Sequence, residues 1–226
     1  MTVRLDPALQ QPESYEIRIT ASGADIAAAD ELGAIYGIYR FSGEYLGVDP
    51  LWFWKDVYPA GRKEPLALDE QTIRSETSCF NWRGWFINDE DLLTEWHELS
   101  GQRHIDYPYY ATVIAHDIAQ AAYEAALRSG ANLIIPASFL DITNPPEAKL
   151  IELAVQRGLY VSQHHIEPLG VSHFGFENYW KHRGCKAEFA FGTEPEKVHE
   201  CWEHFAETWY RIAGDKVVWQ LGLRGK

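Results

Sequence analysis

The sequence predicts an α/β protein that consists of a small N-terminal α/β domain and a longer region built on a parallel sheet. Three observations support this fold class. Apolar residues alternate near the N-terminus and then recur with the period of a helix. After Cys79, four short apolar strands alternate with amphipathic helices. Strands and helices in this alternation are typical of right-handed βαβ units, which build parallel sheets.

The small α/β domain is predicted over residues 1–78, and its first elements are strands. Tyr15, Ile17 and Ile19 alternate with polar residues, which indicates a strand with one buried face. A second, weaker strand is predicted from Asp25 to Ala29.

A helix follows these strands, because apolar residues recur on one side of the segment from Glu31 to Leu46. Gly47 lies just past its end, where glycine commonly terminates a helix. The aromatic run from Val48 to Trp54 is too apolar for a solvated linker, so we expect it to bridge onto the second domain. An alternating segment from Leu66 to Ile73 is expected to complete the small sheet.

The second predicted domain, residues 79–226, repeats a strand–helix order. Its strands are predicted at Trp82–Asn88, Asn132–Pro136, Leu159–Ser162 and Lys216–Leu223. Its helices are predicted at Tyr110–Arg128, from the cap Asn144-Pro145-Pro146-Glu147 to Gly158, and from the cap Thr193-Glu194-Pro195-Glu196 to Gly214. Four such units fit half of a (β/α)₈ barrel or a small doubly wound sheet. A complete barrel ordinarily needs about 250 residues by itself, so a barrel would be incomplete here.

Composition and charge exclude several classes of protein. The formal net charge is −13 and no cluster of Lys and Arg stands out, so a nucleic acid is not an expected partner. The apolar stretches are far too short to span a membrane, and the N-terminus has no signal-like pattern. As written, the chain is expected in the cytoplasm; an upstream export signal would make the protein periplasmic or secreted.

The cysteines and aromatic residues give weaker information. Cys79, Cys185 and Cys201 are widely separated and odd in number, so neither a disulfide framework nor a Cys-x-x-Cys metal site is expected. Aromatic residues make up 14% of the chain, and most must be core. Because sugar rings stack on such side chains, the excess slightly favours a carbohydrate ligand.

The carboxyl ends of the predicted strands carry the candidate site, because these ends form the reactive face in both parallel architectures. Polar and titratable residues cluster at three of these four ends, and long loops follow the first and third strands. The segments are Asn88-Asp89-Glu90-Asp91, Pro136-Ala137-Ser138, Gln163-His164-His165-Ile166-Glu167-Pro168 and Gly222-Leu223-Arg224-Gly225.

Two of these carboxyl groups are candidates for acid–base chemistry. The acidic run after the first strand has a structural alternative, since acidic residues favour a helix N-terminus. Alternation along Trp85-Phe86-Ile87 nevertheless points one acid into the site, and we choose Asp89. Glycoside hydrolysis needs two carboxyl groups across the scissile bond. Asp89 and Glu167 follow different strands and can oppose each other.

The remaining candidates have two interpretations each. His164, His165 and Glu167 have the composition of a metal site, but adjacent histidines on a strand point to opposite faces, so sugar binding is favoured over metal binding. A structural role is the alternative for each histidine. Arg224 carries a planar guanidinium suited to a carboxylate ligand or to an ion pair with a strand-end acid such as Asp89.

Three motifs in this order and spacing resemble glycoside hydrolase family 115, the xylan α-1,2-glucuronidases. They are Arg83-Gly84-Trp85-Phe86-Ile87-Asn88-Asp89-Glu90-Asp91, His164-His165-Ile166-Glu167-Pro168 and Gly222-Leu223-Arg224-Gly225. Upstream, Gly33-Ala34-Ile35-Tyr36-Gly37-Ile38-Tyr39 and Leu46-Gly47-Val48-Asp49-Pro50-Leu51-Trp52 resemble the small domain that precedes the barrel in that family.

The resemblance implies the first half of a TIM (β/α)₈ barrel and an inverting hydrolase that needs no cofactor. Its substrate would be glucuronoxylan or its oligosaccharides, from which it removes glucuronic acid or 4-O-methylglucuronic acid. We therefore expect Asp89 and Glu167 to be catalytic. The expected substrate-binding residues are Trp85, Asn88, Glu90, His164, His165 and Arg224, with Arg224 matching an arginine that meets the uronate carboxylate.

The family pattern continues past the Arg-Gly pair to further acids, whereas this sequence stops at Lys226. We therefore expect an N-terminal piece of a larger enzyme that is inactive by itself, with a homodimer of the full-length enzyme as a possible assembly. Two rival hypotheses are a non-catalytic carbohydrate-binding remnant and a metal-dependent barrel hydrolase.

Overall fold

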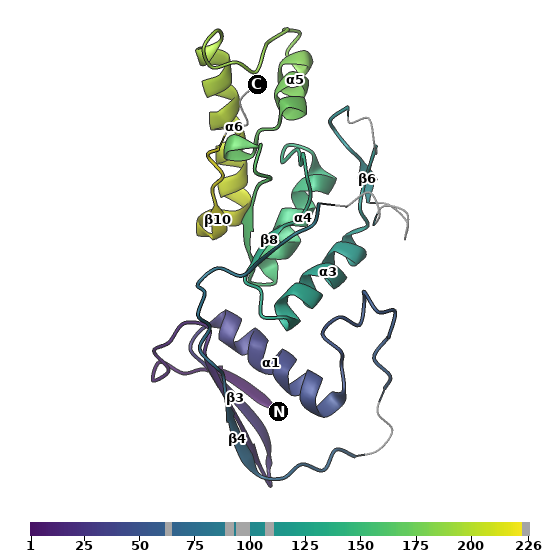
Figure 1. Cartoon of the computed structure of the whole chain (residues 1–226), viewed down its shortest axis with the longest axis vertical. Coiled ribbons are helices and arrows are strands. Elements are labelled where there is room, and N and C mark those ends of the chain that lie inside the picture. The colour runs from purple at the N-terminus through teal and green to yellow at the C-terminus, as the bar shows by residue number, and fades with distance from the viewer. Residues whose placement is uncertain (62–64, 89–92, 94–99, 107–110, 223–226) are drawn as a thin grey trace. The chain divides into compact units, whose positions relative to one another are not determined.

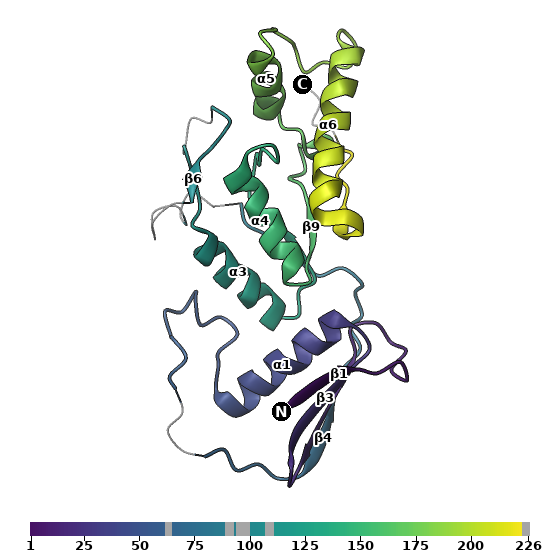
Figure 2. The same cartoon turned by 180° about the vertical axis from the view of Figure 1, so that it is seen from behind.

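A computed structural model describes residues 1–61, 65–88, 93, 100–106 and 111–222 (Figures 1 and 2). The chain divides into two compact units. Unit 1 comprises Met1–Arg83 together with Glu124–Asn132, and unit 2 comprises Gly84–Tyr123 and Leu133–Lys226. The expected domain boundary between residues 78 and 79 stays a prediction.

Unit 1 is built on a four-stranded mixed sheet with the order β1-β3-β2-β4. Its strands are β1 (Thr2–Leu5), β2 (Tyr15–Thr20), β3 (Gly23–Ala28) and β4 (Gln71–Arg74). β1 runs parallel to β3, and β2 runs antiparallel to both β3 and β4. The predicted alternation in β2 is confirmed, because Ile17 and Ile19 are buried. The first strand, β1, was not predicted.

The helix α1 (Glu31–Leu46) covers this sheet and is confirmed at both ends (Figure 1). Asp30 caps its start by accepting a hydrogen bond from the Gly33 N–H at 2.8 Å. Gly47 ends it in the left-handed conformation, with φ of 72°. The helix approaches the sheet closely: a Cβ on Gly37 would lie 2.7 Å from the Cγ2 of Ile26. Glycine at this position is therefore a condition of the packing between α1 and β3.

Unit 2 contains a parallel sheet whose strands follow one another in chain order, β5-β8-β9-β10. They are β5 (Gly84–Phe86), β8 (Leu133–Ile135), β9 (Tyr160–Ser162) and β10 (Val217–Val218). All four predicted strands exist, and each is shorter than predicted. The other residues of each predicted strand lie in loops at the strand ends. There, hydrogen bonds join one loop to the next in place of the regular pairing between strands. The sheet is buried at its centre, since Ile134 and Val161 are 0% exposed.

The helices between these strands are α3 (His116–Arg128), α4 (Pro145–Gln156) and α6 (Pro195–Ala213). α4 and α6 lie beside each other and pack on β9 and β10 respectively (Figure 2). The apolar face of α6 supplies Phe205 and Trp209, both 1% exposed, to the core of unit 2. Among the residues that the structure describes, no helix combines the length and the apolar character that crossing a membrane requires.

The predicted start of the first of these helices is wrong. The helix begins at His116, and Thr112–Val113 instead form β7, which pairs antiparallel with β6 (Gly101–Gln102). β-Branched Thr and Val favour an extended backbone, and the sequence period alone did not resolve this. Tyr110, the predicted first residue, lies outside the described residues.

The two predicted cap segments do precede α4 and α6, with a proline in the first turn of each helix, but neither supplies a side-chain cap. The side chain of Asn144 makes no capping hydrogen bond at the start of α4, and Glu194, rather than Thr193, precedes α6 without a side-chain cap. Glu147 is 2% exposed and accepts a hydrogen bond from the Asn144 side-chain amide at 2.6 Å. It also accepts from the backbone N–H groups of His104 and Asp141. These polar side chains bond to groups other than those that the local capping pattern predicted.

One helix was not predicted at all. α5 (His173–His182) lies in the long segment after β9, where the sequence indicated only a loop. The Ser172 hydroxyl accepts a hydrogen bond from the Gly175 N–H at 2.9 Å, which caps its start. Phe176, Tyr179 and Trp180 lie on one buried side and pack toward α6. This spacing of three and four residues was the signal that could have revealed the helix.

Candidate active site

The described part of the candidate site lies at the carboxyl ends of β5, β8 and β9. Three of the predicted site residues, Asp89, Glu90 and Arg224, lie outside the described residues. The structure therefore bears on Trp85, Asn88, His164, His165 and Glu167.

Asn88 is exposed and joins two successive strand ends. Its side-chain oxygen accepts a hydrogen bond from the Ser138 hydroxyl at 3.0 Å. Ser138 follows β8 and is 4% exposed. This bond connects the segment after β5 to the segment after β8.

Trp85 and Phe86 are adjacent in β5, so their side chains point to opposite faces of the sheet. The Phe86 ring lies with its centroid 5.0 Å from that of His164. Phe86, which the sequence did not single out, therefore lines the same region as His164, and the substrate-binding role of Trp85 stays a prediction.

His164 and Glu167 lie together after β9. The Glu167 side chain is 1% exposed, and its Oε1 lies 3.7 Å from Nδ1 of His164. Nδ1 is itself buried and has no hydrogen-bond partner among the described residues. Burial raises the pKa of the Glu167 carboxyl above its usual 4.5, and the adjacent His164 and the Phe139 N–H oppose this rise.

Phe139, which directly follows the predicted strand-end segment Pro136-Ala137-Ser138, is held in an unusual conformation. Its φ is 55°, in the left-handed region that costs a non-glycine residue of the order of 1–3 kcal/mol. Its N–H donates a hydrogen bond to Oε1 of Glu167. Its ring contacts the His164 ring at a centroid distance of 5.3 Å. The conformation of Phe139 thus places both its N–H and its ring against residues of the next strand end.

A buried ion pair holds the other side of this turn. Arg103, which follows β6, donates from Nη2 to the carbonyls of Ser138 and Phe139 at 3.0 and 2.6 Å. The same nitrogen lies 3.5 Å from Oε1 of Glu147, and the two side chains are only 3% and 2% exposed. Sequence reasoning missed Arg103 and assigned Glu147 to a helix cap. The available signal was an isolated arginine in a long loop on the reactive face.

His165 is exposed, and its ring lies at a centroid distance of 4.2 Å from that of His164, at 85° to it. The two adjacent rings thus differ in environment, one buried and one facing solvent. Within the described ranges, His, Cys, Asp and Glu side chains nowhere gather in threes with a geometry suited to a metal ion.

A small cavity of about 390 Å³ lies near this turn, lined by residues after β6 and on α5. The His104 and His182 rings both line it and contact each other, with centroids 4.9 Å apart. Nδ1 of His104 lies 2.9 Å from Oδ2 of Asp141, a carboxylate only 1% exposed at its side chain. Asp141 therefore fixes His104 at the cavity.

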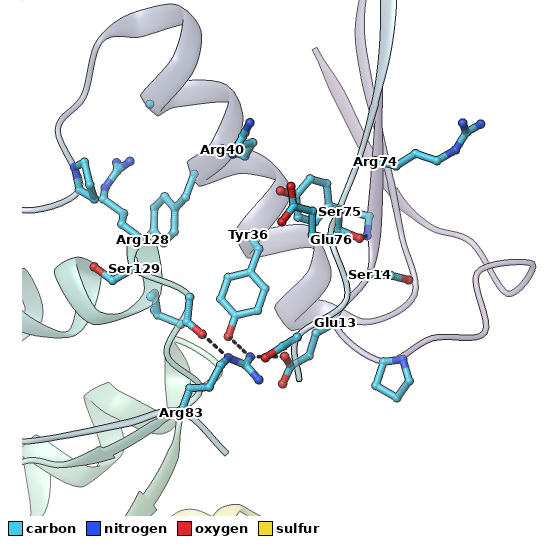
Figure 3. Close-up of a pocket in the computed structure, with 18 of the residues that line it drawn as sticks. Glu13, Ser14, Tyr36, Arg40, Arg74, Ser75, Glu76, Arg83, Arg128 and Ser129 are labelled. Atoms are coloured by element: carbon cyan, nitrogen blue, oxygen red, sulfur yellow. Dashed lines mark hydrogen bonds and ion pairs between the residues drawn. The ribbon is translucent and has the colours of Figure 1, made fainter. Parts of the chain in front are cut away.

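A larger cavity of about 920 Å³ is lined entirely by residues of unit 1, and none of the predicted site residues lines it (Figure 3). Arg83 points toward Glu13 and Tyr36 at its edge (Figure 3). The guanidinium also donates to the carbonyls of Gly130 and Phe80, at 2.6 and 2.7 Å. Burial raises the pKa of Tyr36 to about 12, and the nearby Glu13 adds to this rise.

Three arginines that line the larger cavity are paired within the protein. Arg40 pairs with Glu44, Arg74 with Glu16 and Arg128 with Glu124. Because each of these three guanidinium groups already has a carboxylate partner, none of them is a free cation for an anionic ligand. The chemistry of the chain is better sought at the strand ends of unit 2.

Comparison with known proteins places the chain among carbohydrate-active enzymes of one family. The model of glycosyl hydrolase family 115 matches residues 75–226. Among solved structures, BtGH115A, a 4-O-methyl-α-glucuronidase with specificity for decorated arabinogalactans, matches with a TM-score of 0.71 and 25% identity. That match covers 96% of this chain and 27% of the BtGH115A chain.

A β-N-acetylhexosaminidase also matches, at 15% identity over 74% of this chain and 36% of the other, with a TM-score of 0.41. A comparison with curated proteins gave no match. The chain spans about a quarter of the length of BtGH115A.

Proposed function

The chain belongs to glycosyl hydrolase family 115, and we propose that the protein containing it is an α-glucuronidase acting on polysaccharide side chains. The product would be glucuronic acid or its 4-O-methyl ether. The likeness to BtGH115A over nearly the whole chain supports this activity. The observation that carries the proposal within the chain is the series of contacts at adjacent strand ends. Asn88 bonds to Ser138, the neighbouring Phe139 bonds to the buried Glu167, and Glu167 lies beside His164.

The fold proposed for unit 2 is the first half of a (β/α)₈ barrel. Its parallel strands follow chain order, β5-β8-β9-β10. A barrel adds each new strand at the same edge, whereas a doubly wound sheet reverses direction at a switch point. Chain order over four strands therefore supports the barrel over the doubly wound alternative.

The proposed reaction is an inverting hydrolysis without a cofactor. A carboxylic acid protonates the glycosidic oxygen while a carboxylate activates water on the other face, with the two groups about 6.5–9.5 Å apart. Asp89 is the proposed catalytic residue at the end of β5, and Arg224 is proposed to bind the uronate carboxylate. Both belong to the three motifs that resemble the family.

The substrate is proposed as a glucuronic acid side chain on xylan, with the α-1,2 linkage. The relative BtGH115A acts on decorated arabinogalactans, so the polysaccharide is the part of the proposal that needs a direct comparison. Glucuronoxylan oligosaccharides and decorated arabinogalactan oligosaccharides should be offered separately to the full-length protein, and the released uronic acid measured. Release from xylan fragments supports the proposed substrate, and release from arabinogalactan alone contradicts it.

The role of Asp89 is tested by Asp89→Ala in the full-length protein. We expect release of uronic acid to fall by at least 10³-fold, because one of the two groups that act on the glycosidic bond is lost. Asp69→Ala, at an exposed position of unit 1, is the matched control and should keep wild-type activity. Unchanged activity in Asp89→Ala with an intact circular dichroism spectrum would remove Asp89 from the mechanism.

A further inference from the structure

We propose that Glu167 is a positioning residue, which holds the Phe139 turn and the His164 ring in place instead of touching the substrate. This inference rests on the proposed function, because it concerns the same strand-end site. It assigns Glu167 a role different from the catalytic one that its sequence position suggested.

The Glu167 side chain is almost completely buried. It is 1% exposed, against 9% for the His164 side chain beside it. The Oε1 atom of Glu167 already accepts a hydrogen bond from the Phe139 N–H. A glycosidic oxygen cannot reach a carboxyl group that is covered in this way unless His164 or Phe139 moves.

Two buried side chains of opposite charge hold the Phe139 turn from its two sides. Glu167 accepts the N–H of Phe139, and Arg103 donates to the carbonyls of Ser138 and Phe139. Arg103 is in turn paired with Glu147. A left-handed conformation at a phenylalanine persists only where surrounding contacts fix it, and these contacts do so.

The Phe139 turn contacts other residues of the candidate site. Ser138 bonds to Asn88, which directly precedes Asp89 in the sequence. The His164 ring lies against the Phe139 ring at 5.3 Å and against the Phe86 ring at 5.0 Å. The Nδ1 atom of His164 lies 3.7 Å from the Glu167 carboxyl group, which makes Nε2 the ring nitrogen that we propose for contact with a substrate hydroxyl. Glu167 therefore acts on the site through His164 and the turn.

The nearby carboxyl group also favours the tautomer of His164 that carries hydrogen on Nδ1. Glu167→Gln retains an oxygen that can accept the Phe139 N–H, and it removes the negative charge. The variant is thus expected to keep the fold and to alter His164. Glu152→Gln, at a half-exposed glutamate of α4 paired with Lys149, is the matched control.

Kinetics on two leaving groups separate a positioning residue from a general acid. We expect Glu167→Gln in the full-length enzyme to lower kcat/KM by about 10–100-fold, by the same factor for the natural oligosaccharide and for 4-nitrophenyl α-glucuronide. A general acid is dispensable when the leaving group is already acidic, so near-normal turnover of the nitrophenyl substrate with loss of the natural one would overturn the proposal. Rescue of the variant by azide, expected for a general base, would also overturn it.

Imidazole ¹⁵N spectra of the 226-residue chain supply the readout that does not depend on activity. In Glu167→Gln the Nδ1–H tautomer of His164 should become less populated, while His199 and the Glu152→Gln control stay unchanged. An unaltered His164 signal would refute the positioning role. Absence of uronic acid release by the wild-type enzyme would instead refute the proposed function, and the spectra would still decide whether Glu167 positions His164.

Discussion

Glu167, in the segment after β9, and Glu147, in the first turn of α4, carry carboxyl groups that the fold buries almost completely. Burial raises the pKa of each above its usual 4.5, although Arg103 opposes the rise at Glu147 and His164 opposes it at Glu167. A carboxyl whose pKa is raised in the folded state contributes stability that is full below pH 4.5. That stability is lost as the pH rises through the folded-state pKa. Ionisation of these groups therefore weakens the fold above pH 4.5.

The first prediction concerns this pH dependence. Glutamine at position 167 cannot ionise, so the free energy of unfolding of the wild type minus that of Glu167→Gln should decrease as the pH rises from 4.5 to 7. Urea unfolding followed by tryptophan fluorescence at several pH values measures this difference. Glu152→Gln should show no such trend, and a difference that grows with pH would mean that the Glu167 pKa is lowered in the folded state.

The second prediction concerns the coupling between Glu167 and the left-handed Phe139. Glu167→Ala should destabilise unit 2 by about 1.5–3 kcal/mol, since it removes a charge-assisted hydrogen bond to a strained N–H. Phe139→Gly makes the left-handed conformation accessible without a side-chain penalty. In that background the cost of Glu167→Ala should fall by about 0.5–3 kcal/mol. Additive costs in the double-mutant cycle would show that Glu167 does not hold this turn.

At the residue scale, His164 and Glu167 could be proposed as candidate site residues from the sequence, because they follow a recognisable strand. The sequence could not predict that Phe139 is left-handed, since nothing in Ala-Ser-Phe-Leu requires a positive φ. Arg103 was equally hidden, because its carbonyl partners are 35 and 36 residues away and depend on how two loops meet.

At the scale of elements, the contact between α1 and the sheet of unit 1 depends on glycine. A Cβ on Gly37 would lie 2.7 Å from the Ile26 side chain and 3.3 Å from the Tyr15 ring. Ile26 is 1% exposed and cannot move without disturbing the core. By contrast, a Cβ on Gly43 in the same helix would meet only the Val48 carbonyl, at an ordinary 3.6 Å.

The third prediction compares these two glycines. Gly37→Ala should destabilise unit 1 by about 1–3 kcal/mol through overpacking. Gly43→Ala should stabilise it by about 0.5–1 kcal/mol, because alanine favours the helix. Hydrogen exchange at the amides of β2 and β3 reports the change within unit 1. Equal effects of the two substitutions would show that α1 does not pack on β3 at this distance.

The elements were predictable where one pattern sufficed. The period that begins at Glu31 and the following Gly47 predicted α1 to its last residue. α5 was missed because its apolar residues lie in a segment already assigned to a long loop, and β7 was absorbed into the following helix. The two residues of β7 are stabilised by pairing with β6. A local sequence pattern carries no information about this partner strand.

At the scale of the whole molecule, the excess of acidic groups dominates the electrostatics. The formal net charge of −13 implies self-repulsion in the compact state. Several surface ion pairs oppose this, but exposed pairs contribute little, with a median of about 0–1 kcal/mol each. Repulsion should therefore be the larger effect at low salt.

The fourth prediction follows from screening. The Debye length falls from about 30 Å at 0.01 M to about 8 Å at 0.15 M ionic strength, so added NaCl should raise the Tm over this range. KCl at the same ionic strength is the control and should have the same effect. A Tm that falls with added salt would show that attractive ion pairs outweigh the repulsion.

The sequence predicted the alternation of strands and helices in unit 2, and the strand order now favours one of the two architectures it left open. Unit 1 was harder, because it includes Glu124–Asn132, a segment far along the chain. Contacts such as those of Glu13 with Arg83 and Asn132 reveal this membership, and no composition or periodicity encodes them.

These contacts also set an order of events during synthesis. Glu13 bonds to Arg83 and Asn132, which lie 70 and 119 residues later in the chain. At about 5–20 residues per second, the ribosome delivers Asn132 many seconds after Glu13. The N-terminal sheet and α1 can form early, but their last polar contacts wait until β5 and α3 have been translated. We expect a nascent chain that ends before Asn132 to be more sensitive to proteases than one that ends after it.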